Sequence, residues 1–328
     1  MQPGRNEDDM RAAQLTSPKT LEIIETDVPA PNENEILVKL ETISVCGSDL
    51  RKYDAVLPEE EYPLEIGKPN HECIGIVVES KSNIYKVGDR VIVLASKSDG
   101  LKEYMTEHET NAVLVPNYGD PAVWLMCQPM GTVLFSCQET GSFLGKNVAI
   151  LGQGPIGLNF TSLVAAGGAK NVITTDLLDN RLEVSKNIGA THTINPSKSN
   201  PLEAVEEITN GELVDIVIEA AGEESTLNQC FDLVKRQGFV TLFGVQWNEN
   251  LNLEIGTMFD KQIKLIATSS ARSGRRNIAV EQTISLVDQN RLALDHLITH
   301  RKTFDDVQQA YDMYSDKTDD CLKVVMEF

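Results

Sequence analysis

Hydrophobic and polar positions follow one rhythm up to about Lys146 and a different rhythm after it. In the first part, short β-like runs are separated by turns that contain Pro and Gly; they are Leu21–Glu25, Glu35–Leu40, Cys73–Val78 and Arg90–Leu94. Several short strands at this spacing predict a mostly β domain between about Arg11 and Pro116. From about Asp120 to Thr140 the pattern favours a helix, and Gly141–Lys146 connects this helix to the part of the chain that follows.

After Lys146, short apolar strands alternate with helical stretches. The expected strands are Asn147–Leu151, Asn171–Thr175, Val214–Glu219, Gly238–Val245 and Ile263–Thr268, with helices up to about Ala166, over Asn180–Asn187 and near Ser225–Lys235. This alternation is typical of βαβ units and of a parallel sheet covered on both faces. The pieces beyond Ala271 are too few to form a domain, so we expect them to rejoin the first one. The predicted organisation is residues 1–135 with 271–328, and residues 136–270.

Composition limits which partners and which cellular compartment are expected for this protein. The chain has 29 Lys+Arg against 49 Asp+Glu, a formal net charge of −20, and such a surface repels nucleic-acid phosphates. No apolar run approaches the ~20 residues that cross a bilayer, and the polar, acidic Met1–Asp9 is unlike a secretory leader. We therefore expect a cytoplasmic protein with neither nucleic-acid nor membrane partners.

The six cysteines do not suggest a disulfide framework. They lie far apart, and no two form a C-x-x-C pair. Most are expected to be buried small hydrophobic residues.

The strongest motif is a glycine-rich loop of the kind that binds dinucleotides. Gly152, Gly154 and Gly157 follow the strand Asn147–Leu151 directly, and a helix begins after them. Here Gly152 allows the tight turn, Gly154 lets the backbone approach a pyrophosphate, and Gly157 lets helix and strand pack closely. The alternative is a glycine-rich turn without a ligand.

Asp176 closes the next expected strand, nineteen positions after Gly157. Its carboxylate can accept hydrogen bonds from the adenosine ribose and would repel the extra phosphate of NADP, so NAD(H) is the expected cofactor. The predicted cofactor-binding residues are Gly152, Gly154, Pro155, Ile156, Gly157, Asp176, Arg181, Val245 and Thr268.

A candidate metal pair lies in the first part of the chain. Cys46 stands in Cys46-Gly47-Ser48-Asp49, and His71-Glu72 follows twenty-five residues later. Thiolate and imidazole are ligands that zinc favours. Taken alone, one Cys and one His in a domain are more often packing residues.

Several motifs in order resemble those of the zinc-dependent medium-chain alcohol and polyol dehydrogenases, in particular the sorbitol, threonine and sugar dehydrogenase branch. They are Cys46–Asp49, His71-Glu72 with Gly75, Val87–Val91, Gln128–Gly131, Gly152–Gly157, Leu297–Arg301 and Lys323–Val325. The resemblance spans nearly the whole chain from Met10. It implies an α/β fold in which a GroES-like, mostly β catalytic domain accompanies a Rossmann domain with a doubly wound parallel sheet.

The resemblance also implies roles for individual residues. Cys46 and His71 would be zinc ligands, with Gln128 or Glu72 completing the site. Asp49 would orient the histidine. Ser48 would pass the proton of the substrate hydroxyl onward while hydride moves to the nicotinamide. The predicted catalytic residues are thus Ser48, Asp49 and Glu72.

Four departures from the family pattern qualify these roles. Gln128 replaces the usual anionic third ligand, and the adjacent Cys127 is a possible substitute. The segment Leu94–Gly100 is short and has no cysteine, so one catalytic zinc and no structural zinc are expected. Arg51 and Lys52 stand where a relay histidine is common; they could attract an anionic substrate or be ordinary surface charges. Asn70 occupies a position that is usually glycine.

The sequence therefore predicts an NAD-dependent oxidoreductase acting on the CH–OH group of a polyol, sugar or hydroxy-acid-like alcohol. Two alternatives remain: a metal-free reductase of enones or quinones, and a catalytically silent NAD-binding regulatory protein. The resemblance further implies a homodimer or homotetramer.

Overall fold

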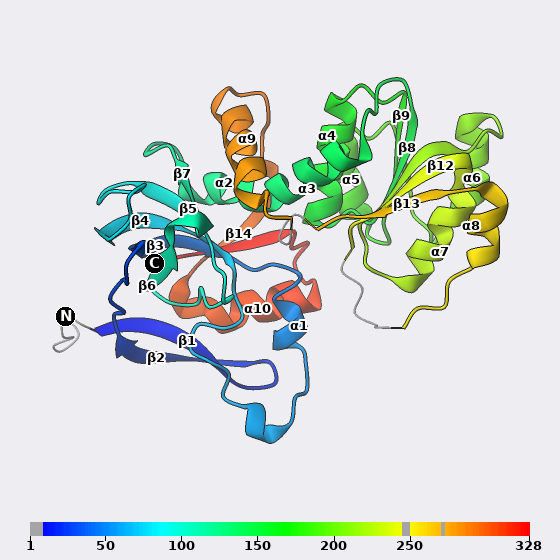
Figure 1. Cartoon of the computed structure of the whole chain (residues 1–328). Helices are drawn as coiled ribbons and strands as arrows, with labels where there is room; N and C mark the ends of the chain where they lie inside the picture. Colours follow the sequence, from blue (N-terminus) through cyan, green and yellow to red (C-terminus); the bar gives the residue numbers. More distant parts are fainter. Residues whose placement is uncertain (1–8, 245–249, 270–272) are drawn as a thin grey trace. The chain divides into compact units, whose positions relative to one another are not determined.

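The computed structural model describes residues 9–244, 250–269 and 273–328, and the chain forms two units (Figure 1). Unit 1 consists of Met1–Gln128 and Val280–Phe328, and unit 2 of Pro129–Ala279. Both boundaries lie inside helices, α3 (Cys127–Thr140) and α9 (Arg276–Asp288). Helical periodicity cannot reveal a boundary of this kind, because the pattern continues across it.

Unit 1 is built on a seven-stranded sheet with the order β14-β15-β3-β4-β5-β7, in which β6 also pairs with β3. A separate hairpin consists of β1 and β2. The strands are β1 (Asp9–Ser17), β2 (Thr20–Asp27), β3 (Glu35–Ser44), β4 (Glu72–Ser80), β5 (Arg90–Leu94), β6 (Tyr104–His108), β7 (Ala112–Val115), β14 (Ile298–Thr303) and β15 (Lys323–Glu327). The helices are α1 (Leu50–Tyr53), α2 (Pro121–Leu125) and α10 (Val307–Asp316).

The core of unit 1 explains why the last part of the chain belongs to it. Alternate residues of β3, such as Ile36, Val38 and Leu40, are fully buried, as expected for one face of a strand. They share a cluster with Val307 and Tyr311, four residues apart on one face of α10. Strand β15 then runs antiparallel to β3.

Unit 2 contains a six-stranded, all-parallel sheet with the order β10-β9-β8-β11-β12-β13. Its strands are β8 (Asn147–Leu151), β9 (Asn171–Thr175), β10 (His192–Ile194), β11 (Val214–Glu219), β12 (Val234–Leu242) and β13 (Lys264–Ala267). Its helices are α4 (Pro155–Ala166), α5 (Asp179–Asn187), α6 (Pro201–Thr209), α7 (Glu224–Leu233) and α8 (Ile255–Lys261). The expected α/β class, with a mostly β part and a parallel sheet covered by helices, is confirmed.

The strand order reverses between β8 and β11. Because parallel crossovers are right-handed, α4 and α5 cover one face of the sheet and α7 and α8 cover the other (Figure 1). Ligands of such sheets bind outside the carboxyl ends of the strands at the reversal point. β8 lies between β9 and β11 in the strand order, so its carboxyl end, and the glycine loop that follows, lie at this point.

Several expected boundaries are wrong. The helix predicted near Ser225–Lys235 ends at Leu233, because β12 begins at Val234 without an intervening loop, and the strand predicted for Gly238–Val245 is instead Val234–Leu242. The strand predicted for Glu35–Leu40 continues to Ser44. The helix α6 was not predicted. The strand β10 was not predicted either, because it has only three residues and two of them are exposed.

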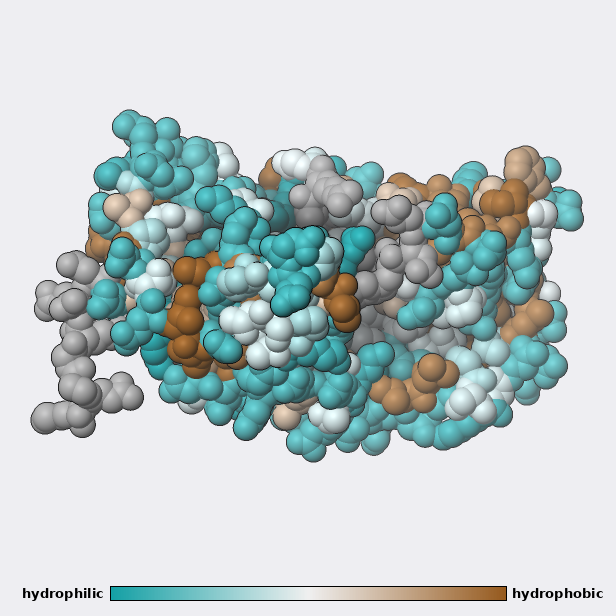
Figure 2. All heavy atoms as spheres, turned by 90° about the horizontal axis from the view of Figure 1, so that it is seen from below, coloured by the Kyte–Doolittle hydropathy of each residue, from teal (hydrophilic) through white to brown (hydrophobic). Residues whose placement is uncertain are grey.

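The surface agrees with the acidic composition. Hydrophilic side chains cover most of the face shown in Figure 2, and hydrophobic ones form separate patches. Among the described residues, no helix combines the length and apolar character that crossing a membrane requires.

Candidate active site

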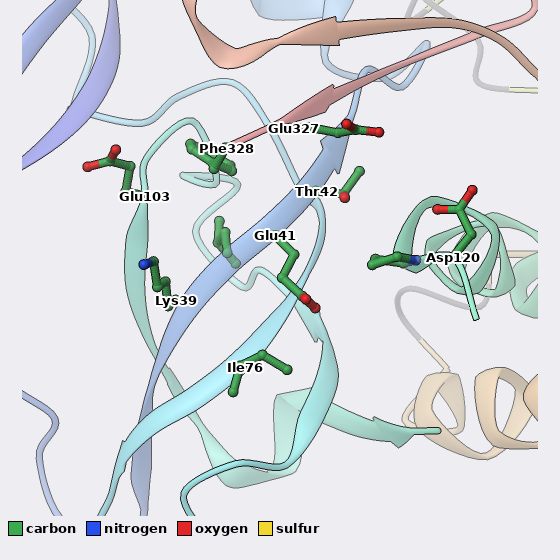
Figure 3. A pocket seen from close by; sticks show the side chains of 10 residues that line it. Lys39, Glu41, Thr42, Ile76, Glu103, Asp120, Glu327 and Phe328 are labelled. Carbon is green, nitrogen blue, oxygen red and sulfur yellow. The ribbon is translucent and has the colours of Figure 1, made fainter. Parts of the chain in front are cut away.

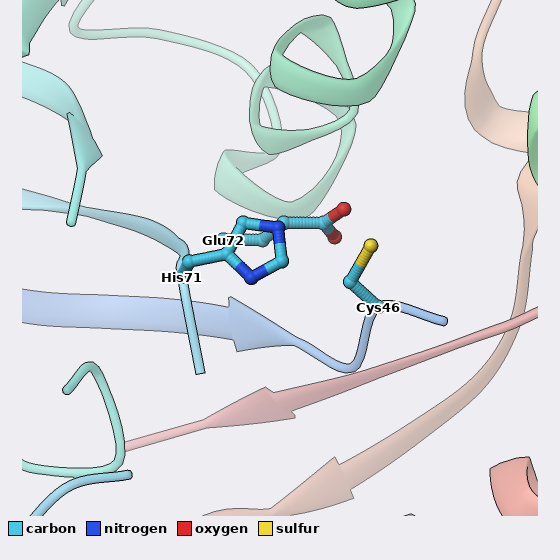
Figure 4. Close-up of side chains that lie close together, drawn as sticks. All are labelled: Cys46, His71 and Glu72. Atoms are coloured by element: carbon cyan, nitrogen blue, oxygen red, sulfur yellow. The ribbon is translucent and has the colours of Figure 1, made fainter. Parts of the chain in front are cut away.

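The metal-type cluster in unit 1 forms where two neighbouring strands meet. β3 ends at Ser44, which pairs with Glu72 at the start of β4. Cys46 therefore lies just after one strand and His71 just before the other. One ligand atom from each of Cys46, His71 and Glu72 lies within 4.8 Å of the others, and their side chains converge (Figure 4).

Asp49 fixes the first two members of this cluster. Its Oδ2 accepts a hydrogen bond from the Cys46 backbone N–H (3.0 Å), and its Oδ1 lies 2.6 Å from His71 Nδ1. Because a carboxylate only accepts hydrogen bonds, Nδ1 carries the proton and Nε2 is left as the available ligand atom. Burial alone would lower the pKa of His71, but the negative charges of Asp49 and Cys46 raise it well above its usual value. The site is thus built to hold positive charge.

Glu72 is held by a buried cation. Lys323 Nζ, on β15, donates to Glu72 Oε2 at 2.5 Å and to the Val45 carbonyl at 2.9 Å, and the Ser44 hydroxyl also donates to Oε2. Burial would raise the pKa of Glu72, but the charges of Lys323 and His71 lower it. The pKa of Lys323 is raised, because the Glu72 charge outweighs the opposing effect of burial. Glu72 is therefore an ionised carboxylate whose charge is already compensated.

Sequence reasoning did not assign Lys323 a role in the site. The available indication was a lysine that interrupts the apolar run Leu322–Met326, since a lysine buried in a strand requires a partner. Its partner Glu72 lies 251 residues away in the sequence and could not be identified from the pattern.

Gln128 leaves one oxygen atom without a partner. Its Nε2 donates to the His71 carbonyl at 2.8 Å, while the buried Oε1 has no hydrogen-bond partner in the described chain. The neighbouring Cys127 is also buried, and burial raises the pKa of its thiol, which disfavours the thiolate that a metal needs. The donor set of Cys46, His71 and Gln128 therefore fits a zinc ion better than one that includes Cys127.

The remaining candidates of unit 1 lie on the surface after Cys46. The Ser48 side chain is exposed, and its hydroxyl lies 3.4 Å from Cys46 Sγ. Arg51 and Lys52 are exposed on α1, whereas Tyr53 of the same turn is buried. Within the described residues, neither Arg51 nor Lys52 forms an ion pair.

A groove elsewhere in unit 1 contains none of the candidate residues. It has a volume of about 590 Å³ and lies beside β3, where Lys39, Glu41 and Thr42 contribute to its wall (Figure 3). One of the carboxylates that line it, Glu41, is paired with Arg90 at 2.8 Å. This groove has no evident part in the chemistry of the cluster.

In unit 2, the glycine loop has the expected form. Gly152 has φ +90°, and a Cβ on Gly157 would lie 1.8 Å from the Gly152 carbonyl oxygen, so neither position admits a side chain. Gly154 is the N-cap of α4, and Pro155 and Ile156 begin the helix. The N-terminus of α4 thus faces the carboxyl end of β8, as in sites that bind phosphate groups.

Asp176 and Arg181 lie beside this loop. Asp176 Oδ2 accepts from Gln153 N–H at 2.7 Å, and its Oδ1 accepts from Leu178 N–H at 2.9 Å. The Arg181 Nη1 lies 3.8 Å from Asp176 Oδ2 and 3.7 Å from where a Cβ on Gly154 would be. Arg181 Nε is buried without a partner in the described chain.

The other two predicted cofactor residues are placed differently. Thr268 directly follows β13, but its hydroxyl is bound to Ser136 Oγ at 2.7 Å. Val245 lies outside the described residues.

A buried acid at the same sheet edge was not predicted. Glu219 ends β11, and its Oε1 accepts hydrogen bonds from Ala221 N–H, Gly222 N–H and the Thr226 hydroxyl. Its Oε2 is buried without a partner in the described chain, and burial raises its pKa. The available indication was an acidic residue at the end of an apolar strand.

Comparisons with known proteins agree with this architecture. A family model described as "Alcohol dehydrogenase GroES-like domain" matches residues 32–142, and one described as "Zinc-binding dehydrogenase" matches residues 155–288. Sorbitol dehydrogenase of Bacillus subtilis is 26% identical over 97% of both chains. L-threonine 3-dehydrogenase of Bacillus velezensis is 27% identical over 92% of this chain and 94% of its own.

Solved structures show the same fold over nearly the whole chain. An Escherichia coli oxidoreductase/dehydrogenase of unknown specificity has a TM-score of 0.87 and 25% identity, with 97% of this chain and 99% of that chain covered. A protein described as a short chain alcohol dehydrogenase from Escherichia coli, complexed with NADH, has a TM-score of 0.85 and 22% identity, with 98% and 100% covered.

The fold and the matched models define the class of alcohol dehydrogenase-like oxidoreductases. More particularly, the chain belongs to the zinc-type medium-chain alcohol and polyol dehydrogenase family, which confirms the expected resemblance. It is a dehydrogenase that acts on alcohols.

Proposed function

We propose that this protein transfers hydride between NAD(H) and a small alcohol or carbonyl, such as a polyol, sugar or hydroxy acid, with one catalytic zinc ion. The observation that carries the proposal is the convergence of Cys46, His71 and Glu72, within 4.8 Å. Gln128, bonded to the His71 carbonyl, adds a buried oxygen that has no partner in the described chain. The similarity to sorbitol dehydrogenase supports the choice of polyols.

Cys46, His71 and Gln128 would hold the zinc ion. Glu72 is the reserve ligand, because its charge is already paired with Lys323. A neutral glutamine in place of an anionic ligand leaves the site about one charge more positive, which weakens metal binding and strengthens the polarisation of substrate.

When bound, zinc would supply a Lewis acid that favours deprotonation of the substrate hydroxyl, and NAD would supply the acceptor for the hydride on the carbon that bears this hydroxyl. The chain's own residues hold and move the proton. Asp49 keeps His71 in the tautomer with a free Nε2. The exposed Ser48 hydroxyl, hydrogen-bonded to Cys46 Sγ, would receive the proton of the substrate hydroxyl and pass it towards solvent.

The preference for NAD over NADP follows from Asp176. Its carboxylate is held beside the glycine loop by two backbone N–H groups, where it can accept from ribose hydroxyls and repel a ribose phosphate. Arg181 lies close enough to the loop to bind the pyrophosphate.

The exposed Arg51 and Lys52 favour a substrate that carries a carboxylate or phosphate. They come after Ser48 in the sequence, lie on α1 and form no ion pair with any described residue. They could therefore bind an anionic group at the far end of a substrate. Polyols with and without a terminal carboxylate distinguish this part of the proposal.

The test is zinc content together with NAD-dependent turnover. We expect about one zinc per chain after dialysis without chelator, oxidation of at least one member of a polyol and sugar panel, and loss of both in Cys46→Ala. The matched control is Cys127→Ala, which should retain zinc.

Other results would point elsewhere. NAD binding with turnover that persists after zinc removal would support a metal-free reductase. NAD binding without turnover on any alcohol, enone or quinone, with or without added zinc, would indicate a catalytically silent NAD-binding protein.

A further inference from the structure

The hydrogen-bond ladder between β3 and β4 stops before it reaches Cys46 and His71. Ser44 pairs with Glu72, so the next antiparallel positions would pair Val45 with His71 and Cys46 with Asn70. The Asn70 backbone instead turns to another segment: its N–H donates to Ser98 O at 3.0 Å, and its carbonyl accepts from Gly100 N–H at 2.9 Å. Regular strand pairing therefore does not hold the backbone of Cys46 against β4.

The Asn70 side chain supplies the missing connection. Its Nδ2 donates to the Ser44 carbonyl at 2.8 Å, and its Oδ1 lies 3.4 Å from the Cys73 thiol. Asn70 is fully buried. A glycine here, as in the family pattern, would leave the Ser44 carbonyl without this donor.

The segment Ala95–Leu101, which we call the 95–101 loop, is fitted to this side chain. A Cβ on Gly100 would lie 2.7 Å from Asn70 Oδ1 and 2.3 Å from Cys73 Sγ, so the loop approaches as closely as glycine allows. Leu101 N–H also donates to the Gly67 carbonyl. The loop thus contacts β3 through Asn70, and it contains no cysteine for a structural metal.

Three side chains bind the backbone of the segment Ser44–Cys46, and the Val45 N–H also donates to the Val324 carbonyl of β15 at 3.3 Å. Asp49 binds the Cys46 N–H, Lys323 binds the Val45 carbonyl, and Asn70 binds the Ser44 carbonyl. Only Asn70 is also joined through a peptide bond to His71. A change at Asn70 therefore acts on both candidate ligands at once.

We propose that Asn70 is a positioning residue that sets the distance between Cys46 and His71 and couples the metal site to the 95–101 loop. This inference rests on the zinc site proposed above. Because partners of metal ligands typically contribute 10–100-fold to metal affinity, removing the amide donor should weaken zinc binding by about that factor.

The experiment compares the zinc affinity of wild type, Asn70→Asp and Asn70→Gly by competition with a chromogenic chelator at pH 8. Asn70→Asp keeps the shape and the acceptor facing Cys73 but replaces the donor facing Ser44 with a carboxylate oxygen. We expect both variants to lose about 10–100-fold in affinity and to alter the visible absorption of the cobalt-substituted protein. Cys73→Ala is the matched control, since it spares the bond to Ser44 and should bind zinc within about twofold of wild type.

Gly100→Ala tests the loop separately, because it crowds Asn70 without removing any of its atoms; it should also weaken zinc binding. Circular dichroism of the metal-free proteins shows whether each variant folds, and Gly100→Ala decides the question if both Asn70 variants fail to fold. Folded Asn70 variants or Gly100→Ala with wild-type zinc affinity and cobalt spectra would overturn the inference. A wild-type protein that binds no zinc would refute the proposed function itself.

Discussion

The buried pair of Glu72 and Lys323 allows a quantitative prediction. Both side chains are about 2% exposed, and their charged atoms are 2.5 Å apart. Lys323→Met should leave the Glu72 carboxylate buried with only the Ser44 hydroxyl as a donor. Breaking a pair of this kind costs about 3–5 kcal/mol, or about 6–20 °C in Tm for a unit of this size.

The assay is urea unfolding of chelator-treated protein, followed by Trp124 fluorescence in a Trp247→Phe background, since the chain has two tryptophans and Trp124 is buried in unit 1. The control is Lys19→Met, which removes an exposed pair with Asp54 at 3.3 Å and should cost at most about 1 kcal/mol. The double variant Lys323→Met/Glu72→Gln should recover most of the lost stability, because no unpaired charge remains buried.

The stability that the pair of Glu72 and Lys323 contributes depends on pH in a definite direction. The pKa of Glu72 is lowered and that of Lys323 is raised, so the pair stabilises the fold fully between the unfolded-state values of about 4.3 and 10.4. Glu72 loses its contribution as pH falls through its lowered pKa, and Lys323 as pH rises through its raised one. In Lys323→Met, the loss should shrink between pH 7.5 and 5 as Glu72 takes up a proton. A loss below about 1 kcal/mol, or a double variant no more stable than the single one, would refute the reasoning.

Three further predictions concern unit 2. Asp176→Ala should raise the ratio of kcat/KM with NADP to that with NAD at least about tenfold, or 1.4 kcal/mol; an unchanged ratio removes this carboxylate from cofactor selection. Gly157→Ala should abolish NADH binding measured by fluorescence, because its Cβ would lie 1.8 Å from Gly152 O, whereas Gly256→Ala has open space and should bind normally. The raised pKa of Glu219 means that the fold loses stability as pH rises from about 4 through that pKa. Glu219→Gln should lack this loss when the free energy of urea unfolding is measured against pH. Parallel profiles for wild type and the variant would contradict the prediction.

The sequence predicts the fold where hydrophobic runs are short and bounded by turns. The expected ranges Arg90–Leu94, Asn147–Leu151, Asn171–Thr175 and Val214–Glu219 coincide with β5, β8, β9 and β11. Each contains an apolar run that begins directly after a polar or charged residue, so at least one of its limits is marked; the runs are Val91–Leu94, Val148–Leu151, Val172–Ile173 and Ile216–Ile218. The junction of α7 and β12 has no such marker, because Leu233 and Val234 are both apolar and both fully buried.

The site was predictable only as far as local motifs reach. Cys46, Asp49, His71 and Glu72 were identified because they stand in two short motifs, and the structure brings them together. The roles of Lys323 and Asn70 depend on contacts with Glu72 and Ser44 that sequence spacing does not encode. The third ligand stays a prediction: Gln128 Oε1 has no partner in the described chain, whereas Glu72 lies in the cluster but is paired with Lys323.

The two-part construction of unit 1 has a consequence for biosynthesis. The strand β15, which pairs with Thr42–Ser44 and carries Lys323, leaves the ribosome roughly 10–40 s after Gln128 at typical translation rates. During that interval the nascent chain can complete unit 2, while the Thr42–Ser44 end of β3 lacks its partner strand and Glu72 lacks its cation. Chains that stall before β15 would expose an unpaired strand edge, and we expect chaperones or proteases to recognise them.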